Sequence, residues 1–149
     1  MMTRGPQSTT EVLSNALAAH PEVVTSLEAM HEVAWTTVDA DLLDLCRVRV
    51  AMLLGHDESI AAPELSPELV AALPLWPTSP LFTPAQRACL AFTEQFVIDV
   101  ASMDDATVAG VSAALGTQGL ADFANALLVI EQRQRMHLAW QRLIPEVVG

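Results

Sequence analysis

The spacing of apolar residues predicts a chain built from helices. Apolar side chains recur three and four positions apart along most of the sequence, the period that places them on one face of a helix. One such run, which includes a single histidine, contains Val23, Val24, Leu27, Met30, His31 and Ala34. No alternation of apolar and polar residues is long enough to predict a strand. The pattern therefore predicts an all-α fold.

Capping residues divide the first part of the chain into three predicted helices. The candidate N-caps are Thr9 or Thr10 for a first helix ending near residue 19, and Asp39 or Asp41 for the third. Pro21 suits the first turn of the second helix, where its missing N–H would have no helical partner. Gly55 is a natural end for the third helix, because glycine readily adopts the left-handed conformation.

The second half of the chain predicts further helices after a polar connection over residues 55–65. Their expected ranges are 66–73, 83–100, 102–115 and 117–143. Ser102 and Asp105 have the spacing of a capping box. Gly116 separates the last two helices, and the turn over residues 115–120 is expected to join antiparallel neighbours. We expect residues 1–8 to form a flexible lead-in and residues 9–149 a single domain of about six to seven helices.

Composition supports helices and excludes some partners. The sequence is 52% apolar but only 5% aromatic, which favours closely packed Ala-, Leu- and Val-rich helices. Seven arginines and no lysine face 18 acidic residues, for a net charge of −11. This charge argues against nucleic acid and against anionic membrane surfaces as partners. The N-terminus lacks a signal-peptide pattern and no apolar run approaches a membrane span, so a cytoplasmic location is expected.

The two cysteines, Cys46 and Cys89, lie far apart in the sequence. They form neither a Cys-x-x-Cys pair nor a zinc-ligand pattern. We expect each to be a small buried hydrophobic residue in a reducing compartment. No metal site and no cofactor are predicted.

Several segments together resemble the AhpD-like/carboxymuconolactone decarboxylase family. The stretch Asp44–Gly55 resembles the helix that leads into the active site of that family, which ends in Asn-Gly before a Cys-x-x-Cys-x-x-x-His motif. Other similar segments are Leu73–Trp76, Ser79–Thr83, Gln86–Ala88, Ala91–Glu94 and Val129–Leu138, where Arg135 matches a family arginine. The resemblance spans about residues 15–142. It implies an AhpD-like helical domain that assembles into a homo-oligomer, a trimer or a hexamer.

The sequence departs from the family at the residues that carry its peroxidase chemistry. The two family cysteines fall on His56 and Ser59, the family histidine on Pro63, and the family glutamate on Asp44. Dithiol chemistry requires a thiolate that attacks and a second thiol that resolves the adduct. Neither histidine nor serine can replace these thiols, so the resemblance does not carry the peroxidase mechanism to this chain.

Asp44, His56 and Ser59 are the candidate catalytic residues. If the family geometry is retained, they gather near one helix end, where a carboxylate could orient the imidazole of His56 for acid–base chemistry. Ser59 could donate a hydrogen bond to a substrate oxygen or act as a nucleophile. The alternative is that residues 56–59 form an ordinary exposed polar turn.

A second cluster lies on the last predicted helix. Glu131 and Arg135 are four positions apart and suit an ion pair, and Arg133 and His137 share the same spacing. Arg49, Arg135 and His137 are the candidate substrate-binding residues, for an acidic small molecule between helices. The alternative is that this cluster pairs with acidic groups of a neighbouring subunit.

Three functions follow from these observations. The first is a redox-silent member of the family that binds a small molecule or a partner as an oligomer. The second is a cofactor-free enzyme that uses His56 and Asp44 on a small organic acid, as a decarboxylase, isomerase or lyase. The third is a family-type alkylhydroperoxidase or peroxiredoxin that would have to use Cys46 or Cys89.

Overall fold

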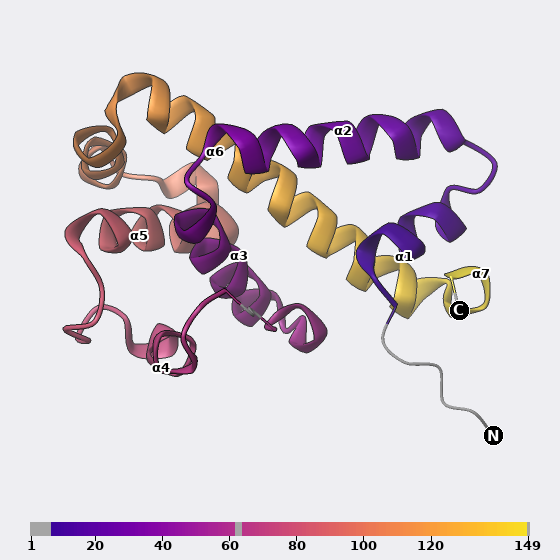
Figure 1. Cartoon of the computed structure of the whole chain (residues 1–149), viewed down its shortest axis with the longest axis horizontal. Helices are drawn as coiled ribbons and strands as arrows, with labels where there is room; N and C mark the ends of the chain where they lie inside the picture. Colours follow the sequence, from indigo (N-terminus) through magenta and orange to yellow (C-terminus); the bar gives the residue numbers. More distant parts are fainter. Residues whose placement is uncertain (1–6, 62–63, 149) are drawn as a thin grey trace.

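The computed structural model describes residues 7–61 and 64–148, and it is all-α over these ranges (Figure 1). The α-helices are α1 (Thr9–Ala16), α2 (Pro21–Thr37), α3 (Ala40–Leu54), α4 (Pro67–Ala72), α5 (Pro84–Asp99), α6 (Asp105–Leu143) and α7 (Pro145–Val148). Short 3-10 turns are η1 (Asp57–Ser59), η2 (Leu73–Leu75) and η3 (Val100–Ser102). No residue in the described ranges forms a strand. The predicted fold class is confirmed.

Three helix boundaries form as their capping residues predict. The Asp39 side chain accepts a hydrogen bond from the Leu42 backbone N–H at 3.0 Å and caps α3. Gly55 ends α3 with φ of 71°, the left-handed conformation that glycine adopts at low cost. Thr83 caps α5 and forms a reciprocal capping box with Gln86.

Two expected caps are corrected by the structure. Ser8, in a capping box with Glu11, caps α1 in place of Thr9 or Thr10, so these two threonines lie inside the helix. Asp104 caps α6 through the Thr107 backbone N–H at 2.6 Å, in place of the predicted Ser102 box. In both cases the cap is the residue directly before the first helical residue, and its side-chain oxygen accepts the hydrogen bond. Residues 1–6 of the expected lead-in lie outside the described residues.

Helix α6 is the centre of the fold. Its C-terminal part runs between α2 and α3 toward α1, and α5 packs on its N-terminal part (Figure 1). Leu43, Phe123 and Leu127 are among the fully buried side chains that join these helices. By length and composition alone, α6 could cross a membrane, but the core helix of a soluble protein passes the same test. It packs against five of the other described α-helices, namely α1, α2, α3, α5 and α7.

The two cysteines lie in this core. Cys46 on α3 and Cys89 on α5 are both fully buried, and both are free thiols. The Thr93 hydroxyl, also fully buried, donates to the Cys89 backbone oxygen at 2.7 Å. The expectation that each cysteine behaves as a buried hydrophobic residue is confirmed.

Gly116 breaks α6 into two helical parts. Its φ of 80° and ψ of 171° are non-helical and fall in a region that is essentially restricted to glycine. The loop expected over residues 115–120 is thus a single residue, and the chain changes direction there (Figure 1). Gly119 completes the corner, because a Cβ at that position would lie 2.7 Å from the Leu115 Cβ.

We predict that Gly116→Ala lowers the free energy of unfolding by about 1–3 kcal/mol, the cost of holding a non-glycine residue in this conformation. Gly110→Ala is the matched control, because Gly110 is helical and its added Cβ would meet Ala88 at an ordinary 3.6 Å. This control should be neutral or slightly stabilising, since alanine favours the helix. Urea denaturation measures both, and equal effects of the two substitutions would contradict the strain at Gly116.

Candidate functional site

His56 is buried at the end of α3, against the last helix. Directly after Gly55, its backbone N–H donates to the Ala51 oxygen at 2.8 Å, and its side chain is 2% exposed. The imidazole rings of His56 and His137 have centroids 4.4 Å apart at an interplanar angle of 63°. The structure therefore brings together two predicted site residues, one from each of the two predicted clusters.

His137 connects this histidine pair to the N-terminal helix. Its Nδ1 shares a hydrogen bond of 2.8 Å with the Thr9 Oγ1, across 128 positions of sequence. Which atom donates depends on the tautomer of the ring. Thr9 is half-buried, and it is the link between the histidine pair and the cavity described below.

Arg47 brings Asp44 and Ser59 together. Its Nε donates to Asp44 Oδ1 at 2.6 Å, and its Nη1 donates to both the Ser59 backbone oxygen and the Ser59 Oγ, the latter at 3.2 Å. Its Nη2 donates to the Ala61 backbone oxygen at 2.8 Å. The carboxylate of Asp44 is thus engaged by a guanidinium three residues along the same helix. Pro63, where the resemblance places the family histidine, lies outside the described residues.

A cavity of about 240 Å³ lies between α1, α2, α3 and α6, beside η1. Its lining combines hydroxyls, two guanidiniums, an amide and an imidazole with one aliphatic side chain. The lining residues are Thr9, Thr10, His31, Arg47, Ser59, Ile130, Arg133 and Gln134. We call this cavity the arginine pocket. Of the predicted catalytic residues, Ser59 lines it directly, and His56 reaches it through His137 and Thr9.

Arg133 is the most deeply buried charge in this lining. The residue is 7% exposed, and its Nη1 donates a hydrogen bond of 3.1 Å to the Glu28 Oε1 on α2. The Thr10 hydroxyl donates to the same Glu28 oxygen at 3.3 Å. This single-oxygen contact uses one nitrogen of the guanidinium, so the other donors of its planar fork have no protein partner in the part of the chain described.

Two more buried polar groups line the arginine pocket. Gln134 is 4% exposed, and its Nε2 donates to the Arg47 backbone oxygen at 3.1 Å, which joins α6 to α3. The pKa of His31 is lowered, first by burial and then by the nearby Arg133 guanidinium, with Glu28 opposing. His31 is therefore predominantly neutral at pH 7. Its ring also lies edge-on to Trp35, with centroids 6.1 Å apart.

Two arginines that the sequence suggested for substrate binding have other partners. Arg49 forms an ion pair with Glu94 on α5 at 2.7 Å, and the Trp76 Nε1 donates to the same carboxylate oxygen at 2.8 Å. Arg135 pairs with Glu131 at 2.7 Å, which confirms the ion pair predicted from their spacing. Neither Arg49 nor Arg135 lines the arginine pocket.

The cysteine thiols are held in their protonated form. Burial raises the pKa of Cys46 to about 12, although a hydrogen bond with Thr93 opposes the shift and Cys89 adds to it. Burial also raises the pKa of Cys89 to about 12. Since the thiolate is the nucleophile in peroxide reduction, both cysteines are poor candidates for that chemistry.

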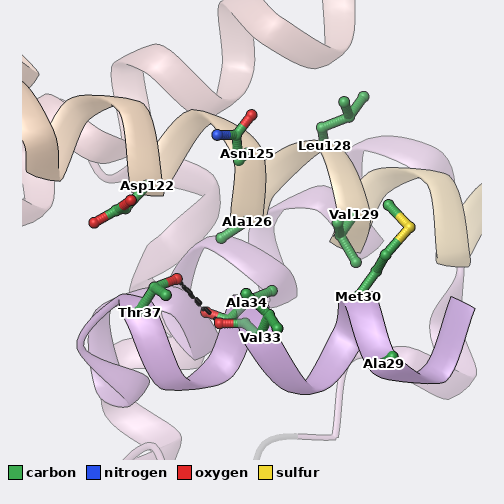
Figure 2. A pocket seen from close by; sticks show the side chains of 10 residues that line it. All are labelled: Ala29, Met30, Val33, Ala34, Thr37, Asp122, Asn125, Ala126, Leu128 and Val129. Atoms are coloured by element: carbon green, nitrogen blue, oxygen red, sulfur yellow. Dashed lines mark hydrogen bonds between the residues drawn. The ribbon is translucent and has the colours of Figure 1, made fainter. Parts of the chain in front are cut away.

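A second cavity is an apolar groove between α2 and α6, with a volume of about 450 Å³ (Figure 2). Figure 2 shows Met30 and Val33 of α2 and Leu128 of α6 around it, and all three are exposed. Asp122 is the one charged residue among the ten that line it. We call this surface the α2/α6 groove. Its chemistry differs from that of the arginine pocket and suits contact with another apolar surface.

The comparisons with known proteins identify the fold. No protein-family profile and no curated protein sequence matches the chain. A crystal structure of a protein of unknown function from Agrobacterium tumefaciens, described as a candidate antioxidant defence protein AhpD, superimposes with a TM-score of 0.77. The match covers 85% of this chain and 93% of the other, at 16% sequence identity. The fold of this chain is AhpD-like, as the sequence resemblance indicated.

Proposed function

We propose that this protein is a redox-silent AhpD-like protein that binds a small carboxylic acid in the arginine pocket. The proposal rests on Arg133, whose buried guanidinium lines the cavity and uses one nitrogen to hydrogen-bond Glu28. A guanidinium presents two parallel N–H groups that match the two oxygens of a carboxylate. In a partly desolvated cavity such a contact is stronger than at an exposed site.

The donor groups that line the pocket, rather than its net charge, support an anionic ligand. Two of the seven arginines line this one cavity. Their protein partners, Asp44 and Glu28, are outside its lining. Each guanidinium is already paired with one of these carboxylates, so the case for an anionic ligand rests on the N–H groups of Arg133 that Glu28 does not use.

The size of the cavity limits the ligand. Cavities that hold drug-sized ligands are typically about 300–1,000 Å³, and the arginine pocket is smaller at about 240 Å³. Hydroxyls of Thr9, Thr10 and Ser59 add polar contacts, and Ile130 adds an apolar one. This lining suits a compact acid with a short carbon chain.

We predict that Arg133→Met weakens the binding of small carboxylates at least tenfold, because the substitution keeps the volume but removes the guanidinium. Arg142→Met on the exposed end of the same helix is the matched control and should leave affinity unchanged. Thermal unfolding with increasing acetate, propionate or succinate measures binding, because a ligand of the native state raises the midpoint. Equal midpoint shifts in both variants would contradict the proposal.

A second candidate function is acid–base catalysis on the bound acid, and the histidine pair favours it. Thr9 lines the arginine pocket and shares a hydrogen bond of 2.8 Å with His137, whose ring lies against that of His56. In this proposal the Thr9 Oγ1 takes a proton from the carbon next to the carboxylate while its own proton passes to the Nδ1 of His137. The electron pair of the broken C–H bond is delocalised into the carboxylate that Arg133 holds, and return of a proton from solvent to the carbon completes the exchange. His137 would then be the base, and His56, which the sequence suggested for that role, packs its ring against it.

This second candidate predicts deuterium incorporation next to the carboxylate when the protein is incubated with a small acid in D₂O, followed by proton NMR. His137→Gln should slow this exchange at least about 100-fold, the usual contribution of a positioned acid–base group. His20→Gln is the control, since His20 lies on the surface beside Glu22. Wild-type protein that exchanges no faster than buffer would rule out this function for the acids tested.

The alkylhydroperoxidase alternative has the least support. It requires Cys46 or Cys89 to reach a peroxide as a thiolate, and both are fully buried with a raised pKa. The positions where the resemblance places the family cysteines hold His56 and Ser59. A binding protein, or an enzyme that moves protons, uses the groups that do line the pocket.

The α2/α6 groove supports assembly as a homo-oligomer, which we include in the proposal. The same face carries both an apolar groove and the exposed side chains of Val33 and Leu128. A symmetric pair can place such side chains of each copy against the groove of the other, because a twofold interface uses the same patch twice. The near absence of charge in the groove removes the repulsion expected between two strongly acidic copies.

We predict that size-exclusion chromatography with light scattering gives a mass of at least two chains. Val33→Glu combined with Leu128→Glu should reduce it to that of a single chain, because buried carboxylates would face each other across the interface. Ile98→Glu is the control, since Ile98 is exposed on α5 away from the groove. A wild-type mass equal to one chain would contradict this part of the proposal.

A further inference from the structure

The charge that Arg133 brings to the arginine pocket is balanced by Glu28. Two hydrogen bonds reach the Glu28 Oε1, one from the Arg133 Nη1 at 3.1 Å and one from the Thr10 hydroxyl at 3.3 Å. The side chains of Arg133 and Glu28 are 9% and 33% exposed, so water screens this ion pair only in part. The charge of Glu28 therefore contributes to the electrostatic potential at the pocket.

Glu28 acts on the arginine pocket from outside its lining. Arg133 lines the pocket, whereas Glu28 borders a separate open hollow along α2. Because Glu28 engages only one of the three guanidinium nitrogens, a ligand carboxylate can bind the others from the pocket side. The ligand would then share one guanidinium with a protein carboxylate of the same charge, and the two carboxylates would repel each other.

The other charge in the lining is also balanced. Arg47 pairs with Asp44 at 2.6 Å, and each of its three nitrogens donates to a protein acceptor. His31 adds no charge at pH 7, because burial and then the Arg133 guanidinium lower its pKa. The two guanidiniums and their two carboxylates cancel. A first negative charge on a ligand therefore makes the site net negative, and a second one increases that imbalance.

We infer that Glu28 restricts the arginine pocket to acids with a single negative charge. This inference rests on the proposed function, because it assigns a charge class to the same ligand. Selective sites combine attraction for one ligand with repulsion of its competitors. Here Arg133 supplies the attraction and Glu28 the repulsion, so Glu28 determines specificity without lining the pocket.

The first test compares propionate with malonate, which share a three-carbon skeleton and differ by one carboxylate. Affinities for the full-length protein are measured by titration followed through ¹H–¹⁵N NMR shifts, at constant ionic strength and at a pH where both acids are fully ionised. We expect the wild type to bind propionate at least about tenfold more tightly than malonate, the scale of one added repulsion at a partly screened site. Equal affinities, or a preference for malonate, would overturn the inference without any variant.

Glu28→Gln tests whether Glu28 sets this preference. The substitution keeps a side-chain oxygen that can accept from Arg133 and Thr10, and it removes the negative charge. Propionate affinity should rise about tenfold and malonate affinity should rise further, so the preference for propionate narrows. His31 stays neutral in this variant, because the substitution removes the one listed charge that raises its pKa.

Glu32→Gln is the matched control, because it changes the net charge equally at an exposed position one turn along the same helix. This control should keep both wild-type affinities. Unchanged or equally reduced affinities in Glu28→Gln would overturn the inference and leave the proposed function intact. Equal gains in Glu32→Gln would also overturn it, since net charge alone would then explain them. Failure of both acids to bind either the wild type or Glu28→Gln would instead overturn the proposed function.

Discussion

The guanidinium of Arg47 is the interaction on which the arrangement of the site depends. This guanidinium joins Asp44 on the same helix to Ser59 and Ala61 in the segment that follows. The backbone oxygen of Arg47 accepts a hydrogen bond from Gln134 on α6. One residue thereby fixes helix α3, the turn after it and the central helix relative to one another. The Arg47 side chain is 19% exposed, and a carboxylate and carbonyl oxygens replace much of the water that burial removes from it.

The structure separates the two residues that the sequence resemblance aligns with the family cysteines. These residues are His56 and Ser59, and their side chains lie in different parts of the structure. His56 packs inward against His137, whereas Ser59 stays at the wall of the cavity. Formation of a disulfide requires two thiols within bonding distance of each other, whereas the groups that bind a ligand can be spread over several residues. In this chain, the two aligned positions therefore hold polar side chains that lie apart from each other.

The sequence predicts those features that depend on neighbours along the chain. Caps such as Asp39 and Thr83 and the break at Gly116 are visible because each acts within one turn of its own helix. Their residue types are required by local backbone geometry. The Arg47–Asp44 pair could also have been found, because residues three apart on a helix are adjacent. Its role in holding Ser59 could not, since that depends on how the following turn folds back.

The contacts that create the arginine pocket are long-range and leave no local pattern. Glu28 meets Arg133 across 105 positions, and Thr9 meets His137 across 128. From the sequence alone, each of these residues resembles an ordinary polar residue on a helix surface. Only the packing of α1 and α2 on α6 brings them together. The sequence therefore gave no reason to prefer Arg133 and Gln134, which line the cavity, over Arg49 and Arg135, which do not.

Helix α1 gives this pocket a property that rigid walls would lack. At eight residues it is too short to persist in water by itself, so it depends on burying Val12 and Leu13 against the rest of the bundle. The same helix contributes Thr9 and Thr10 to the cavity. If the proposed ligand binds there, detachment of α1 and release of the ligand are one linked equilibrium. Amide hydrogen exchange along α1 would then slow when the pocket is filled.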